Sequence, residues 1–323
     1  MADSSKLGWG LLSTARINRA ILGDMPASKR GQVVAVGSRD AARAEAYAKE
    51  KGLPRWHGSY EALLADPDVH IIYNPLPNHL HAEWTIKALE AGKHVLCEKP
   101  FALTLAEVDA MHAAAHKAGR VLAEAFMYRH HPKTIKTKEL VESGALGEVH
   151  FMRASFSFAL DRAYDVRWDP TMGGGALWDV GCYPVSLARY LFGAPERVEG
   201  WQRLAPTGVD ETFAGTLCFA NQRVAQFDCS FQMPYRTHAE MVGSDGLLTL
   251  TRPFQPDFPE AKLLLQRGEQ VEEIMLDNPG RYWAEIEDMH DAVLNGTPPR
   301  ITPAETRGHV ETILDLYRAA STA

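Results

Sequence analysis

The chain has 323 residues, of which 46% are hydrophobic and 23% charged, and its formal net charge is -7. This composition excludes a disordered or fibrous protein, and the acidic balance argues against nucleic acid or an anionic membrane as the main partner. The length predicts two domains. No apolar run is long enough to span a membrane, and a predicted strand begins almost at the N-terminus, so we expect a cytoplasmic protein with no signal sequence.

The first predicted strand begins near Gly8 and runs into a turn of small residues. Such a turn presents backbone N–H groups to a pyrophosphate at the start of a helix. The usual G-x-G-x-x-G motif is not intact, because Ser13, Ala15 and Asn18 occupy its three positions. We predict a dinucleotide-binding turn in which the cofactor neighbours are Ser13, Thr14, Ala15, Arg16 and Ile17.

The second predicted strand, Val33–Gly37, ends at Ser38 and Arg39. A carboxylate at this tip would accept a hydrogen bond from a free ribose 2′-OH, whereas Ser38 and Arg39 can donate to a 2′-phosphate. The planar guanidinium group suits phosphate oxygens and keeps its charge. The sequence therefore favours NADP over NAD as the cofactor.

Strands and helices alternate through residues 1–125, with a helix stopped by Gly52 and a capping box at Thr104–Glu107. This alternation predicts an α/β domain, a Rossmann-type doubly wound parallel sheet. Further helices are expected from Ser59 and over His79–Ala91. The later strands are expected at Val69–Tyr73, His94–Cys97 and Val121–Ala123.

Residues 126–323 read as an α+β domain with one large, open, mainly antiparallel sheet. After a helix near Pro132–Val141, short predicted strands recur between turn residues. We expect helices on one face of the sheet and a surface for a homodimer or homotetramer on the other. A last helix starts at Thr302 and is expected to pack back on the first domain. The expected strands are Val149–Phe158, Thr212–Phe219, Arg223–Phe231, Ala239–Val242, Leu247–Thr251, Lys262–Leu265 and Val271–Leu276.

The cysteines and histidines predict neither disulfides nor a metal site. No two cysteines form a C-x-x-C pair, which favours reduced, buried thiols in a cytoplasmic protein. His79 and His81 are two residues apart and there is no H-E-x-x-H motif, so we interpret them as pocket or surface residues. The four cysteines are Cys97, Cys182, Cys218 and Cys229.

Two segments carry candidate chemistry. Lys99 follows Glu98 at the carboxyl end of a parallel strand, where ligands of such sheets collect. After three glycines, Gly173–Gly175, Asp179 and Tyr183 are four residues apart on a predicted helix and share one face. An acid and a phenol beside a glycine-lined opening can hold a substrate hydroxyl, although a capped carboxylate and a core tyrosine would give the same pattern.

Together the N-terminal turn, Glu98-Lys99-Pro100 and the Asp179…Tyr183 helix resemble the glucose–fructose oxidoreductase/inositol dehydrogenase (Gfo/Idh/MocA) family. The resemblance covers essentially the whole chain. It is greatest to the branch of dimeric dihydrodiol dehydrogenases and NADP-dependent D-xylose dehydrogenases, in which tyrosine replaces the histidine of inositol dehydrogenases. This resemblance implies a Rossmann domain, an open-sheet second domain, and hydride transfer to or from a sugar-like carbon.

The resemblance implies that Lys99 and Tyr183 form a catalytic pair and that Asp179 anchors the substrate. A phenol with a pKa of about 10 is a poor base near neutrality, and an adjacent ammonium would lower that pKa. Other candidates are less specific, because a Pro-rich loop can be only a turn, an arginine can bridge at the surface, and aromatic rings can be core. The cofactor candidates are Asn74, Pro75, Asn78, His79, Glu98, Lys99 and Arg129, and the substrate candidates are Phe158, Arg167, Trp168, Asp179 and Tyr183.

Three functions remain open at this point. The first is NADP-dependent oxidation of an aldose at its anomeric carbon, as in a D-xylose dehydrogenase. The second is a related enzyme, a trans-dihydrodiol dehydrogenase or a reductase of keto or anhydro sugars. The third is a non-catalytic sugar and dinucleotide sensor, which would have no need of both Lys99 and Tyr183.

Overall fold

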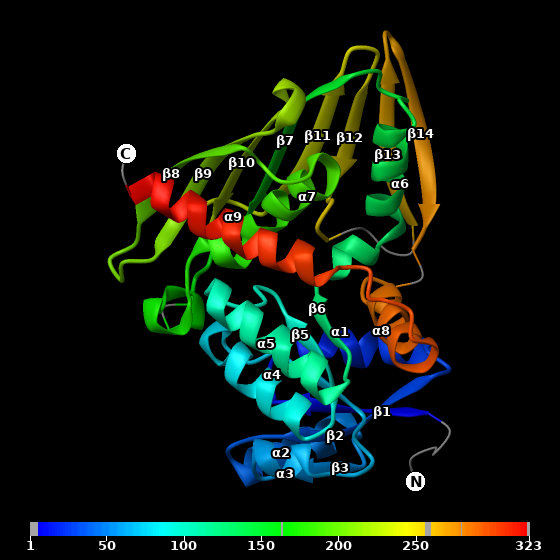
Figure 1. Ribbon diagram of the computed structural model, residues 1–323, viewed down its shortest axis with the longest axis vertical. Coiled ribbons are helices and arrows are strands. Elements are labelled where there is room, and N and C mark those ends of the chain that lie inside the picture. The colour runs from blue at the N-terminus through cyan, green and yellow to red at the C-terminus, as the bar shows by residue number, and fades with distance from the viewer. Residues whose placement is uncertain (1–5, 163, 256–259, 279, 322–323) are drawn as a thin grey trace. The chain divides into compact units, whose positions relative to one another are not determined.

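The computed structural model describes residues 6–162, 164–255, 260–278 and 280–321, which group into two compact units (Figure 1). Unit 1 comprises Met1–Met127 and Gly280–Thr306, and unit 2 comprises Tyr128–Pro279 and Arg307–Ala323. Within these described residues, none of the helices combines the length and apolar character needed to cross a membrane.

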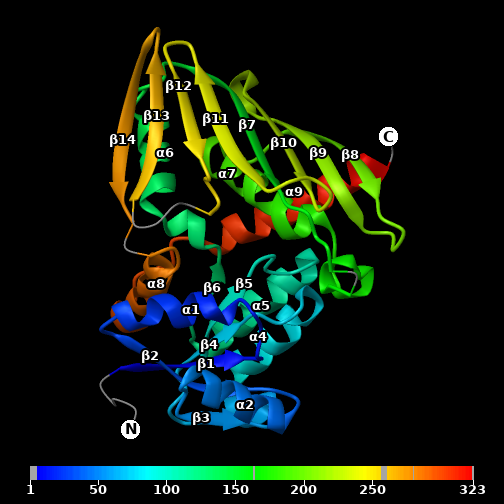
Figure 2. The same cartoon turned by 180° about the vertical axis from the view of Figure 1, so that it is seen from behind.

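Unit 1 is built on a six-stranded parallel sheet in the order β3-β2-β1-β4-β5-β6. Helices α4 and α5 lie on one side of this sheet and α1 and α8 on the other (Figures 1 and 2). The strands are β1 (Leu7–Leu12), β2 (Gly31–Gly37), β3 (Arg55–His57), β4 (Ile71–Asn74), β5 (His94–Glu98) and β6 (Leu122–Ala125). The helices are α1 (Asn18–Asp24), α2 (Ala41–Lys51), α3 (Tyr60–Leu64), α4 (His81–Glu90), α5 (Leu105–Ala118) and α8 (Trp283–Asn295).

The strand order of unit 1 reverses between β1 and β4, which are neighbours in the sheet. At such a reversal the loops after the two strands diverge, and ligands of open parallel sheets bind at the carboxyl ends there. This sheet confirms the predicted Rossmann-type fold. The local signals also hold, since Gly52 ends α2 at a φ of 66° and Thr104 and Glu107 form the capping box of α5.

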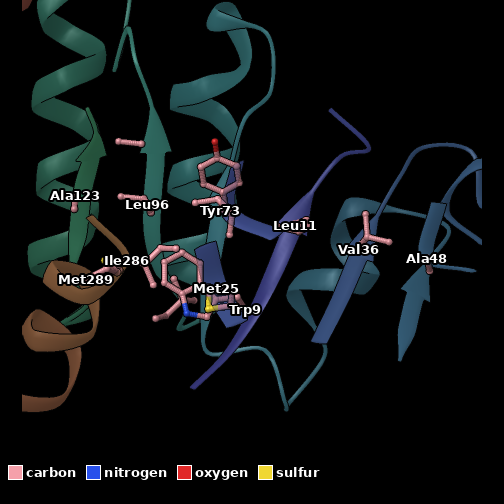
Figure 3. Packing of buried hydrophobic residues seen from close by; sticks show 13 residues of the cluster. Trp9, Leu11, Met25, Val36, Ala48, Tyr73, Leu96, Ala123, Ile286 and Met289 are labelled. Atoms are coloured by element: carbon pink, nitrogen blue, oxygen red, sulfur yellow. The ribbon is translucent and has the colours of Figure 1, made fainter. Parts of the chain in front are cut away.

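The core of unit 1 includes a helix from far down the chain. Ile286 and Met289 of α8 lie beside Trp9 and Met25 (Figure 3). The Trp9 indole N–H donates to Nε2 of His290 at 3.0 Å, and the two rings meet edge-on. Helix α8 was not predicted from the sequence. Everything after residue 125 was expected in the second domain, whereas the contacts group Gly280–Thr306 with unit 1.

Unit 2 is built on an eight-stranded sheet in the order β14-β13-β12-β11-β7-β10-β9-β8, antiparallel except for the β7–β10 pair. This confirms the predicted open, mainly antiparallel sheet. Its strands are β7 (Val149–Ser157), β8 (Arg197–Leu204), β9 (Asp210–Cys218), β10 (Val224–Ser230), β11 (Arg236–Gly243), β12 (Leu247–Thr251), β13 (Glu260–Arg267) and β14 (Gln270–Asp277). Strand β8 was not predicted from the sequence; along most of it exposed residues, Trp201 among them, alternate with half-buried ones.

Helices cover one face of the unit 2 sheet, and the other face is open (Figures 1 and 2). The helices are α6 (Pro132–Glu142), α7 (Cys182–Phe192) and α9 (Pro303–Ser321), of which α9 groups with unit 2 from Arg307 onward. On the covered face, Phe213 and Phe227 stack, and Phe213 meets Tyr317 of α9. The packing of this last helix on the first domain stays a prediction.

Candidate functional site

The turn after β1 is held by its own backbone and two side chains. The Ser13 N–H donates to the Gly37 carbonyl of β2 at 3.0 Å, and the Asn18 amide donates to the Ser13 carbonyl at 2.8 Å. Ser13 Oγ accepts from the Ala15 N–H at 3.2 Å. Ser13 has a φ of 108°, in a region that normally requires glycine. The backbone at the first glycine position of the motif therefore has a conformation typical of glycine, although the residue there is a serine.

This turn fits a pyrophosphate. In the described part of the chain, the N–H groups of Thr14, Arg16 and Ile17 have no hydrogen-bond acceptor. Helix α1 starts from Ile17 with no side-chain cap. Unpartnered N–H groups beside a small-residue turn are what a Rossmann domain offers to the phosphates of a dinucleotide.

The end of β2 is positively charged. Ser38 is buried and accepts from the Asp40 N–H, and Asp40 in turn caps α2 by accepting from the Arg43 N–H at 3.1 Å. Arg39 is exposed. The charges of Arg39 and Arg43 lower the pKa of the Tyr60 hydroxyl, but burial raises this pKa by more, so it lies above its usual value. The Asp40 carboxylate is thus engaged in capping α2, and two guanidinium groups, those of Arg39 and Arg43, lie near the end of β2.

The loop after β4 is fixed by buried hydrogen bonds. The Asn74 side chain is fully buried, donates to the His81 carbonyl and Thr85 Oγ1, and accepts from the Leu76 N–H. The His81 ring nitrogens lie 2.7 and 2.8 Å from the carbonyl oxygens of Leu76 and Pro100. Asn74 and His81 therefore shape the loop from within.

The remaining candidates on this loop differ in exposure. Pro75 is buried, whereas Asn78 and His79 are half-buried. Nδ1 of His79 is buried and has no hydrogen-bond partner among the described residues. Of the four candidate residues on this loop, His79 is therefore the one with a polar atom to which a bound ligand could form a hydrogen bond.

Lys99 stands just beyond the carboxyl end of β5. The Tyr73 hydroxyl, buried in unit 1, donates to Glu98 Oε1 at 2.5 Å, and the Lys99 N–H lies 3.2 Å from Glu98 Oε2. Burial and the charge of Glu98 raise the pKa of Tyr73 well above its usual value, so this phenol stays a donor. Lys99 itself is half-buried and precedes a cis bond to Pro100. The lysine thus emerges from a fixed strand end at the ligand edge of the sheet.

In unit 2, Arg167 and Asp179 form an ion pair. Arg167 Nε donates to Asp179 Oδ2 at 2.6 Å, and its Nη1 donates to Asp165 Oδ1 at 3.1 Å. The Asp179 charge raises the pKa of Arg167 further, so the guanidinium stays charged. The structure therefore brings together two of the predicted substrate residues and adds Asp165, which the sequence analysis missed.

Two of the three glycines are packed closely against the chain itself. A Cβ on Gly174 would lie 2.5 Å from the Arg167 carbonyl oxygen, and one on Gly175 would lie 2.2 Å from Oδ1 of Asp210. The segment after them is not a plain α-helix, because Leu177–Gly181 is π-helical and α7 begins at Cys182. Asp210 is a further residue that sequence reasoning missed, since no local motif links it to these glycines.

Tyr183 lies in a cluster of aromatic rings. It is 9% exposed, and its ring centroid is 5.3 to 5.6 Å from those of Phe156, Phe254 and Tyr128. These three ring contacts fix the direction in which the phenol points. The hydroxyl of Tyr128 donates to Ser186 Oγ of α7 at 2.8 Å, which ties the cluster to the same helix.

The remaining predicted residues of unit 2 are also in packing contacts. Phe158 and Trp168 both pack on the buried ring of Phe231, at 5.4 and 5.3 Å. Both are half-buried, so each keeps part of its ring at the surface. Arg129 is buried with its guanidinium over the Tyr190 ring at 3.9 Å.

Both halves of the chain match known family descriptions. Residues 8–126 match an oxidoreductase family with an NAD-binding Rossmann fold, and residues 134–249 match the GFO/IDH/MocA C-terminal domain. The fold and the fitted turn therefore define an oxidoreductase with an NAD-binding domain. The chain belongs to the GFO/IDH/MocA family, as its sequence predicted.

Similar proteins cover most of the chain. It is 39% identical over 318 residues to D-xylose 1-dehydrogenase (NADP(+)) 2 from Haloferax volcanii, covering 97% of each protein. It is 35% identical to trans-1,2-dihydrobenzene-1,2-diol dehydrogenase from Xenopus laevis, covering 75% of this chain and 74% of that protein. A 3-ketoreductase from Actinomadura kijaniata, solved in complex with NADP and TDP-benzene, superposes with a TM-score of 0.90 at 30% identity over 97% of this chain and 98% of that one. Variants of that reductase with a tyrosine changed to phenylalanine or a lysine changed to alanine have also been solved.

Proposed function

We propose that this protein is an NADP-dependent oxidoreductase that moves a hydride between the cofactor and a carbinol carbon of a sugar or cyclic polyol. The leading activity is oxidation of an aldose at its anomeric carbon, as a D-xylose 1-dehydrogenase does. The observation that carries this proposal is the similarity to such an enzyme across 97% of both chains.

Residues of unit 1 would hold the cofactor. The N–H groups of Thr14, Arg16 and Ile17 would meet the pyrophosphate, and Ser38 and Arg39 would meet the ribose 2′-phosphate. When bound, the nicotinamide supplies the hydride acceptor in oxidation and the donor in reduction. His79, with its unpartnered ring nitrogen, would complete the cofactor contacts.

The chain's own residues would manage the proton and hold the substrate. Oxidation of a hydroxyl releases its proton, and Lys99 and Tyr183 are the groups proposed to take it. The negative charge of Asp179 would accept a hydrogen bond from a neighbouring sugar hydroxyl, while Arg167 keeps the carboxylate oriented. The exposed part of the Trp168 ring would pack against sugar C–H groups.

The test is turnover with NADP and a panel of aldoses, polyols, dihydrodiols and keto sugars, followed by the absorbance of reduced nicotinamide. We expect the highest kcat/KM with an aldopentose such as D-xylose. Lys99→Ala should lower kcat by on the order of a hundredfold. Tight NADP binding without turnover of any substrate would instead support a sensor.

A second candidate is a dihydrodiol dehydrogenase or keto-sugar reductase. The 35% identity to a trans-dihydrodiol dehydrogenase and the superposition on a 3-ketoreductase favour it. The same panel separates these activities, because a dihydrodiol or a keto sugar would then give the highest kcat/KM.

We also propose that copies of the chain associate through the open face of the unit 2 sheet. Trp201 is 57% exposed there and, with Arg153 and Asp228, lines a surface pocket of about 420 Å³. An exposed indole on an uncovered sheet suits an interface between copies. Light scattering should give a dimer or tetramer for the wild type and a smaller species for Trp201→Glu.

A further inference from the structure

We propose that Asp210 is a positioning residue for the site of unit 2. Its carboxylate fixes the start of the π-helical segment Leu177–Gly181 and thereby the positions of Asp179 and Tyr183. The inference rests on the proposed function of those two side chains and adds a residue that touches neither.

The contacts of Asp210 are short and buried. Asp210 is 2% exposed at the start of β9, and Oδ2 accepts from the Leu177 N–H at 2.7 Å. Oδ1 accepts from the hydroxyl of Tyr317 on α9, also at 2.7 Å. One carboxylate therefore joins a strand, a helix start and the last helix of the chain within unit 2.

The segment that Asp210 holds has no cap of its own. A helix start needs acceptors for its first N–H groups, and a local Ser, Thr, Asn or Asp side chain usually supplies them. Here the preceding residues are Gly175 and Ala176, which carry no side-chain oxygen, and no local side chain caps the segment. Asp210 therefore replaces the missing cap from 33 residues further along the chain.

Close packing at both ends of the segment restricts how the segment can lie. Gly175 has a φ of 124°, and a Cβ there would lie 2.2 Å from Asp210 Oδ1 and 2.9 Å from the Tyr317 hydroxyl. At the other end, a Cβ on Gly181 would lie 2.7 Å from Sγ of Cys229. The two glycines let the segment settle against β9 and β10, and Asp210 fixes where it begins.

The geometry links this anchor to the proposed chemistry. Asp179 lies inside the π-helical segment, and Tyr183 lies two residues beyond its end. Short π-helical turns are uncommon and occur often at functional sites. Loss of the anchor would let the segment relax toward an ordinary α-helix, which would rotate Asp179 away from Arg167 and shift the Tyr183 ring.

The anchor depends on the charge of Asp210. Burial raises the pKa of Asp210 to about 6, although the Tyr317 hydroxyl and the Leu177 N–H favour the ionised form. The other titratable groups near it are Cys229 of β10 and, beyond that thiol, Cys182 and Asp179. A proton on Asp210 would weaken it as an acceptor for both N–H and O–H donors, so the segment should loosen as pH falls through this range.

Fluorine NMR can test the anchor without any turnover. Trp178 lies in the segment with its ring 5.8 Å from that of Tyr317. In protein labelled with 5-fluorotryptophan, the Trp178 signal, assigned through Trp178→Phe, should shift with an apparent pKa near 6. Asp210→Asn should abolish this titration, because the amide keeps the shape but carries no titrating proton. A matched change on the same strand, Glu211→Gln, should preserve it.

Kinetics then tests the consequence for the site. Asp210→Ala should lower kcat about tenfold and raise KM for the sugar, with the Kd for NADP unchanged. Tyr317→Phe should have a smaller effect in the same direction, and Asp210→Asn should lower kcat less than Asp210→Ala does while losing the acidic limb of the pH profile.

The outcomes separate the two proposals. A Trp178 signal that is unchanged in Asp210→Asn, or that titrates equally in it, would overturn the inference whatever the enzyme turns over. Absence of turnover in the wild type, with the Trp178 titration intact, would refute the proposed function alone. If Asp210→Ala does not fold, Tyr317→Phe and Asp210→Asn provide the same comparison.

Discussion

Each unit has a turn near its own candidate residues, and the two turns lead into segments that are held in different ways. The turn after β1 is fixed mainly by neighbouring backbone, with Ser13 bonded to the Gly37 carbonyl and to Asn18. The glycine turn of unit 2 is also closed by backbone, since the Gly174 and Gly175 N–H groups donate to the carbonyls of Asp169 and Arg167. The helical segment after it, however, is held by the distant side chain of Asp210, to which Tyr317 donates in turn. A turn closed by backbone hydrogen bonds tolerates many side chains, whereas a helical segment held by one distant side chain loses that contact when the side chain changes. Unit 1 should therefore be robust to substitution at its turn, and unit 2 sensitive.

The strongest test of this contrast is Tyr183→Phe. Removal of the hydroxyl leaves the aromatic packing intact but removes the proposed proton acceptor, so kcat should fall by on the order of a hundredfold. Stopped-flow or steady-state turnover with NADP and the best sugar would measure it. Tyr190→Phe, on the same helix α7, is the matched control and should turn over like the wild type. Near-normal kcat in Tyr183→Phe would remove its catalytic role.

The next test concerns a side chain of unit 1 that is proposed to bind the cofactor. Arg39→Ala should raise the Kd for NADP by about 10- to 100-fold, as expected for loss of a charge-assisted hydrogen bond of about 1.5–3 kcal/mol. The Kd for NAD should barely change, because NAD has no 2′-phosphate. Calorimetric titrations with both cofactors measure the difference, and Lys117→Ala on α5 serves as a control. Equal losses for NADP and NAD would contradict a 2′-phosphate contact.

A buried carboxyl group tests the interior of unit 1. Glu285 is 1% exposed, and burial, then the charges of Glu98, Asp288 and Glu124, raise its pKa well above the usual value. The folded protein then keeps this proton at pH values where the unfolded chain has lost it, so wild-type stability falls as pH rises above about 4.5. The stability of Glu285→Gln relative to that of the wild type should therefore increase as the pH rises from 5 to 8.

Chemical denaturation at several pH values would measure that trend. The exposed Glu90→Gln on α4 should show no such gain. A difference between Glu285→Gln and the wild type that is independent of pH would mean that the folded protein does not hold the extra proton.

The smallest expected effect is at the backbone-built turn itself. Ser13→Gly should relieve a left-handed conformation that costs a non-glycine residue about 1–3 kcal/mol, offset by the lost hydrogen bond to the Ala15 N–H and by the entropy of glycine. We expect a net gain of up to about 1 kcal/mol, seen as a small rise in Tm by calorimetry, with NADP binding retained. Ser13→Ala should instead lower Tm, because it keeps the strain and loses the hydroxyl.

Local signals allowed much of this molecule to be predicted. The capping box of α5, the αL glycine after α2 and the Ser38-Arg39 tip each depend on residues within a few positions of one another. The position of Lys99 follows from the rule that parallel strands present ligands at their carboxyl ends. These features needed no knowledge of distant neighbours.

The features that the sequence did not reveal depend on long-range contacts. Helix α8 packs on Trp9 through residues more than 270 positions away, and Asp210 reaches Leu177 across 33 positions. The Arg167–Asp179 ion pair joins residues 12 positions apart, and the π-helical segment depends on the same contact from Asp210. Spacing rules describe neighbours along one element, so they could place Asp179 and Tyr183 near each other but not say what fixes them.

The return of Gly280–Thr306 to unit 1 bears on how the protein is made. During synthesis the parallel sheet emerges from the ribosome first, but the indole of Trp9 lacks His290 until almost the whole polypeptide has been translated. While the second sheet is still being synthesised, the nascent chain would therefore expose the apolar surface that α8 later covers, and chaperones could bind that surface. Release at a premature stop before α8 should yield a fragment that aggregates rather than a working nucleotide-binding half.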